Sequence, residues 1–327
     1  MKAAFLDFDS LGPGDIDTSS LKATLPDIQL YASSTVEEID ARIAGCEILL
    51  VNKVDLDRAR LAAAAPTLKL VVLAATGTDN VDLAAARDLG IAVANIRNYA
   101  TPSVVQHVFG LVLALTLRLD EYRQLLQRGA WERSPHFCLL DYPSRELAGR
   151  TLGIVGHGQL GQAVGAVGRA FGMRVIAARS LRQGPAGGHP PDAVQVDRLE
   201  LKELLPVADV VSLHCPLTPA TRQLINRESL ARMRRDAVLI NTARGDLVDT
   251  GALLEALQAG RLGGAGIDVL AEEPPVSGHP LLAARLPNLI VTPHIAWAAR
   301  ESRQRALDEV VSNVRDFLSG GQRNRVA

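Results

Sequence analysis

Short runs of apolar residues recur along the whole chain and alternate with longer segments of helical pattern. In the first hundred residues the runs cover 3–7, 28–31, 47–51, 69–74 and 91–94. Later runs cover 151–155, 174–178, 209–213, 237–241, 265–269 and 289–292. Aliphatic and β-branched residues dominate them, which is typical of parallel strands buried on both faces by helices. The alternation predicts an α/β protein with two doubly wound parallel sheets, one of five strands and one of six.

Two longer segments carry a helical pattern. Apolar residues at helical spacing predict one long helix from Ser103 to Leu119, broken only beyond Gly129, followed by an irregular stretch over 133–144. A second helix is expected over 301–318, and the final eight residues, GGQRNRVA, are expected to fray. Since the first series of strands ends near residue 100 and the second near 293, the last helix can return to the first unit.

Composition and charge narrow the class of protein. Of 327 residues, 47% are hydrophobic and only 4% aromatic, and 35 basic residues face 36 acidic ones. A net charge of −1 gives no long-range attraction to nucleic acid or to an anionic membrane, so neither is expected as a partner. The three cysteines lack metal-ligand spacing, and MKAAFLDFDS is too short for a signal peptide. We expect a cytoplasmic protein with structural thiols and without a metal site.

A glycine-rich turn follows the strand predicted at 151–155. In GHGQLG, the glycines Gly156, Gly158 and Gly161 form G-x-G-x-x-G at the start of a helical segment. Such glycines allow a tight turn, the approach of a pyrophosphate and close helix packing, while free amides at the helix start, here those of Gln159 and Leu160, bind the anion. We expect a dinucleotide site; the alternative is a glycine-rich turn without a ligand.

The end of the next strand bears on which dinucleotide binds. An NAD site usually presents Asp or Glu there, about 20 residues beyond the glycines. This chain has Arg179, Ser180 and Arg182 instead. Arginine and serine can bind a 2′-phosphate by charge-assisted hydrogen bonds, so the sequence favours NADP(H), with NAD(H) possible. The alternative is that these arginines are solvated loop charges.

Three segments follow three successive strands of the second series, at the sheet edge where open α/β folds bind ligands. They are NTARG (241–245), DVLAEEP (268–274) and TPHIAW (292–297). They supply a cation, an acid and an imidazole. Reduction of a 2-oxo acid requires a proton donor and a cation that holds the carboxylate, and a carboxylate partner favours protonated histidine. Each residue alone also has an ordinary reading as a loop charge or a cap.

These segments, with LAATGTDNVDL and the glycine turn, resemble the D-isomer-specific 2-hydroxyacid dehydrogenase family over essentially the whole chain. The resemblance implies a Rossmann cofactor domain (101–294) inserted into a flavodoxin-like substrate-binding domain (1–100 plus 295–327). It also implies that Arg244 orients the substrate, that His294 exchanges the proton and that Glu273 pairs with His294. In the family the acid lies directly before the proline, so the resemblance points to Glu273 and not to Glu272.

The resemblance implies further contacts. Asp268 would meet the nicotinamide carboxamide, and Cys215 would be a wall residue of the cofactor site. The other expected cofactor contacts are Pro216, Thr221, Thr242 and Ala243, and those to the substrate are Lys53, Thr76, Gly77 and Thr78, with Arg244 and His294.

Departures from the common family pattern indicate a branch. Many NAD-using members carry Asp where this chain has Arg179, and many have two glycines where it has Ala296 and Trp297. The tryptophan version, together with the segments ATGTDNVDL and SVVQHVFGLVLAL, is similar to the glycerate dehydrogenase or hydroxypyruvate reductase branch. We therefore expect NADP(H)-preferring reduction of hydroxypyruvate to D-glycerate, and of glyoxylate to glycolate, by a homodimer to which the helix from Ser103 contributes, although its apolar face could be wholly intramolecular. The alternatives are another 2-hydroxyacid, phosphite or formate dehydrogenase, or a nucleotide-sensing protein similar to a corepressor.

Overall fold

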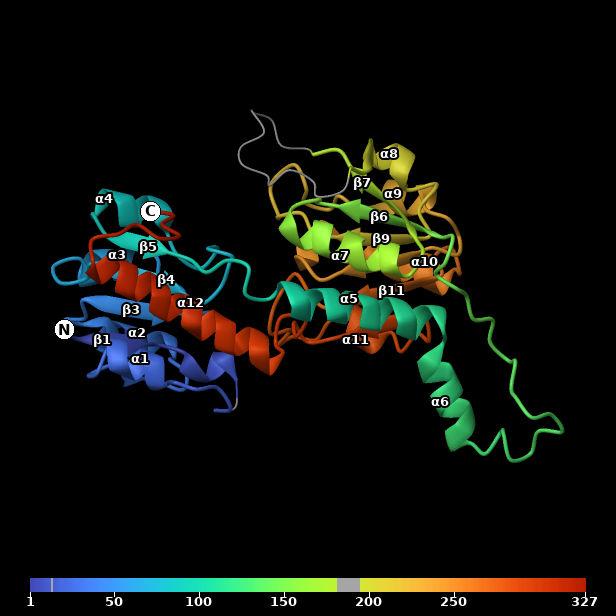
Figure 1. Cartoon of the computed structure of the whole chain (residues 1–327), viewed down its shortest axis with the longest axis horizontal. Helices are drawn as coiled ribbons and strands as arrows, with labels where there is room; N and C mark the ends of the chain where they lie inside the picture. The colour runs from blue at the N-terminus through green and yellow to red at the C-terminus, as the bar shows by residue number, and fades with distance from the viewer. Residues whose placement is uncertain (13, 181–194) are drawn as a thin grey trace. The chain divides into compact units, whose positions relative to one another are not determined.

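The computed structural model describes residues 1–12, 14–180 and 195–327 of the chain. They form two compact units, Met1–Ala100 with Trp297–Ala327, and Thr101–Ala296 (Figure 1). The chain returns to the first unit at residue 297, two residues later than the sequence indicated. Each unit is built on a parallel sheet, which confirms the predicted α/β class.

The first unit contains a parallel sheet with five strands among the described residues, in the order β2-β1-β3-β4-β5. All five predicted runs form strands, each somewhat shorter than its apolar run. Strands β3 and β4 are buried along their whole length, because helices cover both faces. The strands are β1 (Ala3–Phe5), β2 (Gln29–Leu30), β3 (Ile48–Val51), β4 (Leu70–Leu73) and β5 (Ala92–Ala94).

Helices pack on both faces of this sheet. One face is covered by α1 (Ser19–Thr24) and α12 (Arg300–Leu318), which contact each other. The other is covered by α2 (Val36–Ile43), α3 (Arg58–Ala64) and α4 (Leu83–Asp88), and a 3-10 helix spans Phe8–Leu11.

The carboxyl-terminal tail is not frayed, contrary to the sequence prediction. The amide of Val326 donates to the carbonyl of Val93, and the amide of Val93 donates to the carbonyl of Ala327. Strand β5 lies at the edge of the sheet, so its outer backbone groups require partners, and the tail supplies them.

The second unit contains a parallel sheet with seven strands among the described residues, in the order β12-β11-β10-β9-β6-β7-β8. The order reverses between β6 and β9, which is the usual ligand crevice of such sheets. The six predicted strands are present, and sequence reasoning missed β8, a short and mostly exposed edge strand without an apolar run. The strands are β6 (Thr151–Val155), β7 (Arg174–Ala178), β8 (Asp197–Leu199), β9 (Val210–Leu213), β10 (Val238–Asn241), β11 (Gly264–Ile267) and β12 (Leu289–Val291).

The helices of this unit again form two layers. Figure 1 shows α5 (Thr101–Thr116) and α7 (Gln159–Ala170) side by side on one face. The opposite core includes side chains from α8 (Leu201–Leu204), α9 (Arg227–Arg232), α10 (Thr250–Gln258) and α11 (Pro280–Ala283), and a 3-10 helix spans Gly245–Leu247.

The long helix predicted from Ser103 ends earlier than expected. Helix α5 stops at Thr116, and α6 (Leu119–Gln127) begins after Arg118, whose φ of 57° is left-handed and interrupts the helix. The two helices meet at a bend of 57°. In the described part of the chain no single helix has the length and apolarity to cross a membrane; α5 and α6 meet that test only as a bent pair.

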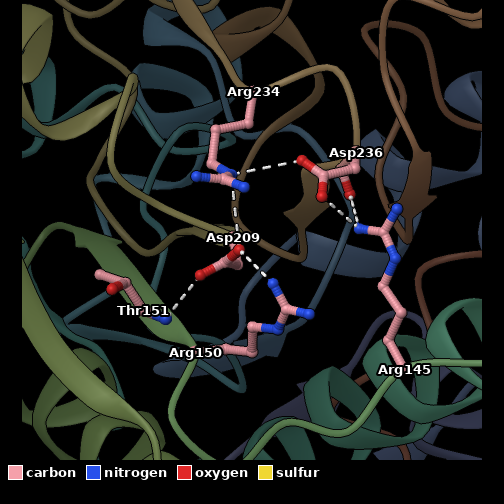
Figure 2. A network of polar contacts seen from close by, with 6 residues as sticks. All are labelled: Arg145, Arg150, Thr151, Asp209, Arg234 and Asp236. Atoms are coloured by element: carbon pink, nitrogen blue, oxygen red, sulfur yellow. Dashed lines mark hydrogen bonds and ion pairs between the residues drawn. The ribbon is translucent and has the colours of Figure 1, made fainter.

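Ion pairs fasten the amino-terminal ends of three strands of the larger sheet (Figure 2). Asp209, just before β9, accepts a hydrogen bond from the amide of Thr151 at 2.8 Å and lies 3.4 Å from Arg150 and 3.5 Å from Arg234. Asp236, two residues before β10, pairs with Arg145 at 2.7 Å. This network holds the sheet edge opposite the one that carries the predicted catalytic segments.

Candidate active site

The three predicted catalytic segments follow β10, β11 and β12, which are neighbours in the sheet. Because parallel strands end at the same edge, the loops that carry Arg244, Glu273 and His294 emerge side by side. Gly245 permits the first two loops to touch, since a Cβ there would lie 2.0 Å from the carbonyl carbon of Leu270. The sequence order of strand and loop therefore assembles the cation, the acid and the imidazole at one edge.

His294 and Glu273 form a direct pair. The imidazole Nδ1 lies 2.5 Å from Glu273 Oε2, and the other carboxylate oxygen accepts a hydrogen bond from the amide of Leu270 at 2.7 Å. About 30% of each of the two side chains is exposed. A carboxylate fixed in this way stabilises a protonated imidazole whose Nε2 can donate a proton.

The backbone at His294 is strained. Its φ of 55° is left-handed, which costs a residue other than glycine about 1–2 kcal/mol. Residues other than glycine that adopt a left-handed backbone conformation cluster at functional sites, where the surrounding structure holds them in place. Here the amide of His294 donates to the carbonyl of Asp268 at 2.8 Å.

Asp268 lies beneath this loop and is only 1% exposed. Its carboxylate accepts hydrogen bonds from the amides of Ile295 and Ala296, at 3.0 and 2.9 Å, and from the hydroxyl of Thr292 at 2.5 Å. The carboxylate thus anchors the loop of His294. Its predicted contact with a nicotinamide carboxamide stays a prediction.

Arg244 begins the turn after β10. Its guanidinium donates to the carbonyl of Ala243 at 2.8 Å, and the side chain of Asn241 donates to the Arg244 carbonyl at 2.9 Å. Asn241 is fully buried and thereby fixes the backbone from which the guanidinium extends.

The glycine turn fits a dinucleotide at all three glycines. Gly156 has a φ of 99°, and a Cβ there would lie 2.4 Å from the amide nitrogen of Cys215. A Cβ on Gly161 would lie 2.3 Å from the carbonyl oxygen of Gly156, so α7 can pack this closely only with glycine. At Gly158 a Cβ would meet no described atom within 4 Å. The first and third positions need glycine for packing, and the second leaves open space at the start of α7, where a pyrophosphate could approach.

Other predicted cofactor residues lie at the ends of the strands around this turn. Gln159 and Leu160 are the first residues of α7, and Cys215 and Pro216 follow β9. The hydroxyl of Thr221 donates to the Pro216 carbonyl at 2.8 Å and so closes that loop. Thr242 Oγ1 is buried and has no hydrogen-bond partner among the described residues, as expected of a group that awaits a ligand.

The residues predicted to select NADP(H) follow β7. Arg179 is exposed and lies 3.5 Å from a carboxylate oxygen of Glu200, and Ser180 is also exposed. Arg182 lies outside the described residues.

In the first unit, the predicted substrate residues follow the adjacent strands β3 and β4. Lys53 is exposed. The buried carboxylate of Asp7 accepts a hydrogen bond from the backbone amide of Lys53 at 2.6 Å and so holds the loop that carries this lysine. Burial raises the pKa of Asp7. The hydroxyl of Thr76 donates to the Ile96 carbonyl at 2.9 Å and starts the turn that contains Gly77 and Thr78.

One polar residue near the site was missed by sequence reasoning. His107 of α5 places Nε2 2.9 Å from Thr292 Oγ1 and 3.4 Å from Asp268 Oδ1. The local pattern marks it as a polar side chain among apolar residues at helical spacing, between Val104 and Leu111.

The chain is similar to several known proteins. Residues 109–296 match the family model described as D-isomer specific 2-hydroxyacid dehydrogenase, NAD binding domain. The chain is 46% identical to a glycerate dehydrogenase of Methylorubrum extorquens over 95% of this chain and 97% of the relative. It is 38% identical to a hydroxypyruvate reductase of Blautia hydrogenotrophica over 100% and 99% of the two chains.

The chain belongs to the D-isomer-specific 2-hydroxyacid dehydrogenase family. This dehydrogenase is NAD(P)-dependent and similar to hydroxypyruvate and glyoxylate reductases. Its fold matches the TT0316 protein of Thermus thermophilus with a TM-score of 0.85, at 36% identity over the whole of both chains. It also matches an acyclic imino acid reductase in complex with NADPH and D-Arg, with a TM-score of 0.85 and 26% identity over the whole of both chains.

Proposed function

We propose that this dehydrogenase reduces hydroxypyruvate to D-glycerate, and glyoxylate to glycolate, with NADPH as the preferred reductant. The pair of His294 and Glu273 at the edge that also carries Arg244 is the observation on which the proposal rests. The names of the relatives at 46% and 38% identity support this choice of substrate.

His294 is the proton donor in this proposal. Its protonated imidazole donates to the carbonyl oxygen of the substrate as negative charge develops there, and in the reverse direction it accepts the proton of the hydroxyl. Glu273 stabilises the imidazolium and fixes its orientation, because its second oxygen is held by the amide of Leu270.

Arg244 binds the carboxylate of the substrate and stabilises the charge of the developing alkoxide. The resemblance to the family further implies substrate contacts by the backbone amides of Thr76, Gly77 and Thr78 and by the cation of Lys53. Small 2-oxo acids suit these residues because the carboxylate and the carbonyl oxygen of the substrate then each have a partner.

The chain's own residues fit a nicotinamide dinucleotide. When bound, this cofactor supplies the hydride. The turn of Gly156, Gly158 and Gly161 would hold the pyrophosphate, with the amides at the start of α7. Thr242, Ala243, Asp268 and the loop of Cys215, Pro216 and Thr221 would line the remainder.

The preference for NADPH rests on the end of β7. Arg179 and Ser180 stand where an NAD enzyme would carry an acid, both are exposed, and both side chains can donate hydrogen bonds to a 2′-phosphate. Glu200 pairs with Arg179, and this contact between exposed side chains is weak enough for a phosphate to replace it. The structurally similar imino acid reductase is described with NADPH.

A substrate panel tests this function. Hydroxypyruvate, glyoxylate, pyruvate and phenylpyruvate should be assayed with NADPH and then with NADH, and phosphite and formate with NADP⁺ and NAD⁺. The proposal predicts the highest kcat/KM for hydroxypyruvate with NADPH. Faster turnover of phosphite, formate or a bulkier 2-oxo acid would replace it with one of the alternative dehydrogenases.

We also propose a homodimer, and we place its contact on α6 and the chain after it. The apolar side chains of α5, which were expected to contribute, are mostly buried inside the second unit. By contrast, Figure 1 shows α6 and the following irregular segment extending away from the sheet of their unit. The exposed apolar side chains of α6 and of the segment after it suit burial against a second copy of the chain; they are Leu119, Leu126, Trp131, Phe137 and Leu140.

A further inference from the structure

The loop that carries His294 is anchored from below by one buried side chain. The two carboxylate oxygens of Asp268 accept hydrogen bonds from the amides of Ile295 and Ala296. The backbone carbonyl of Asp268 accepts a hydrogen bond from the amide of His294. These contacts fix three consecutive residues, the first of which is left-handed at a φ of 55°. The direction of the imidazole therefore depends on the direction of the Asp268 carboxylate.

A second side chain fixes that carboxylate. Thr292 donates its hydroxyl proton to Asp268 Oδ1 at 2.5 Å, and a hydroxyl has a single proton to donate. The contact of 2.9 Å between Thr292 Oγ1 and His107 Nε2 must then have the histidine as donor. The same nitrogen lies 3.4 Å from Asp268 Oδ1. His107 thus donates its Nε2–H to Thr292 and keeps the same nitrogen close to the Asp268 carboxylate.

We propose that His107 is a positioning residue for the proton donor His294. This inference rests on the proposed function of His294, because His107 acts on it through Thr292 and Asp268. Helix α5 packs on β10, β11 and β12, so His107 connects the rigid body of the unit to the loop that bears the imidazole. The geometry requires only an N–H donor at this place, not a titrating group.

This requirement separates positioning from mere packing. In His107→Gln the side-chain amide can still donate to Thr292, whereas His107→Leu fills similar space without a donor. Gln106→Leu is the matched control, since Gln106 is the preceding residue of α5 and is exposed. A residue that only fills space would be replaced better by leucine than by glutamine.

The experiment measures kcat and KM for hydroxypyruvate, the Kd of NADPH and the NMR signal of the His294 imidazole, assigned by its loss in His294→Ala. We expect His107→Leu to lower kcat about tenfold or more and to shift the His294 signal, with the Kd of NADPH unchanged within about twofold. His107→Gln should stay within about threefold of the wild-type kcat, with the signal in place.

Two results would overturn the proposal. One is a wild-type kcat and an unmoved His294 signal in His107→Leu. The other is equal loss in His107→Leu and His107→Gln, because the donor would then not matter. If the wild-type protein reduces none of the 2-oxo acids, the proposed function fails, and the His294 signal of the variants still decides whether His107 positions the loop.

Discussion

The carboxylate of Glu273 and the imidazole of His294 face each other across 2.5 Å, although they lie 21 residues apart in the sequence. One oxygen of Glu273 is fixed by the amide of Leu270, so the other oxygen has a defined direction toward Nδ1. A paired imidazole of this kind presents its remaining nitrogen in one orientation. The pair is therefore the chemical centre of the proposed reaction.

The three glycines of the dinucleotide turn should respond differently to alanine. Gly158→Ala should lower the free energy of unfolding of the cofactor-free protein by no more than about 1 kcal/mol, since φ is −81°, the space around a Cβ is open, and the main cost is that alanine caps α7 less well than glycine. It should weaken NADPH binding about tenfold or more, because the methyl group occupies the approach of the pyrophosphate. Calorimetric titration with NADPH measures the change.

Gly161→Ala is the matched comparison. Its methyl group would lie 2.3 Å from the Gly156 carbonyl oxygen, so we expect a loss of about 1–3 kcal/mol in the free energy of unfolding without the cofactor. If Gly158→Ala binds NADPH like the wild type, the pyrophosphate does not lie at this turn.

Arg179→Asp should reverse the cofactor preference. A charge-assisted contact to a phosphate is worth about 1.5–3 kcal/mol, so the ratio of kcat/KM with NADPH to that with NADH should fall about 10- to 100-fold. Arg174→Asp is the control, because Arg174 begins the same strand at its other end and pairs there with Asp197 at 2.8 Å. An unchanged ratio in Arg179→Asp would remove the argument for NADPH.

The sequence alone predicted the strands that position the site, because buried parallel strands leave continuous apolar runs. The residues alone also predicted that an acid and an imidazole lie at one edge of the sheet, whereas the pairing of His294 with Glu273 followed from the resemblance to the family. Local sequence could not predict the break at Arg118, which depends on one left-handed residue, or the pairing of the tail with Val93. His107 was missed for the same kind of reason, because its partners are brought to it by the tertiary fold.

The segment after α6 should control association. Wild type should sediment at twice the chain mass of 34.9 kDa, and the double variant Phe137→Asp with Leu140→Asp should sediment as a monomer. Both side chains are almost fully exposed, at 90% and 86%, so charges there should not disturb the folded chain. Val276→Asp, at an equally apolar position that is 80% exposed, should remain a dimer. A double variant that still dimerises would place the contact elsewhere.

Stability should fall in mild acid because of His214. Burial, followed by the nearby His157, lowers the pKa of His214 from 6.5 to about 4. The unfolded chain then binds the proton more tightly than the folded one. The contribution of His214 to the free energy of unfolding is therefore fully present above pH 6.5 and is lost as the pH falls toward 4. This group should contribute a loss of about 3 kcal/mol between pH 7 and pH 4.

Urea unfolding of wild type and His214→Gln at several pH values isolates that contribution. Glutamine can retain a hydrogen bond to Ser212, whose hydroxyl lies 2.9 Å from the imidazole, without gaining a charge. The variant should therefore show a flatter dependence of unfolding free energy on pH. Parallel curves for the two proteins would show that His214 does not titrate in this range.

In the proposed reaction His294 delivers the proton, while Glu273 and Arg244 support it. The most direct test is the steady-state oxidation of NADPH by hydroxypyruvate in wild type, His294→Ala, Glu273→Gln and Arg244→Ala, with the Kd of NADPH measured beside it. We predict that His294→Ala lowers kcat about 100-fold or more with little change in the Kd, that Glu273→Gln lowers it less, and that Arg244→Ala also raises KM. A wild-type kcat in His294→Ala would show that His294 is not the proton donor.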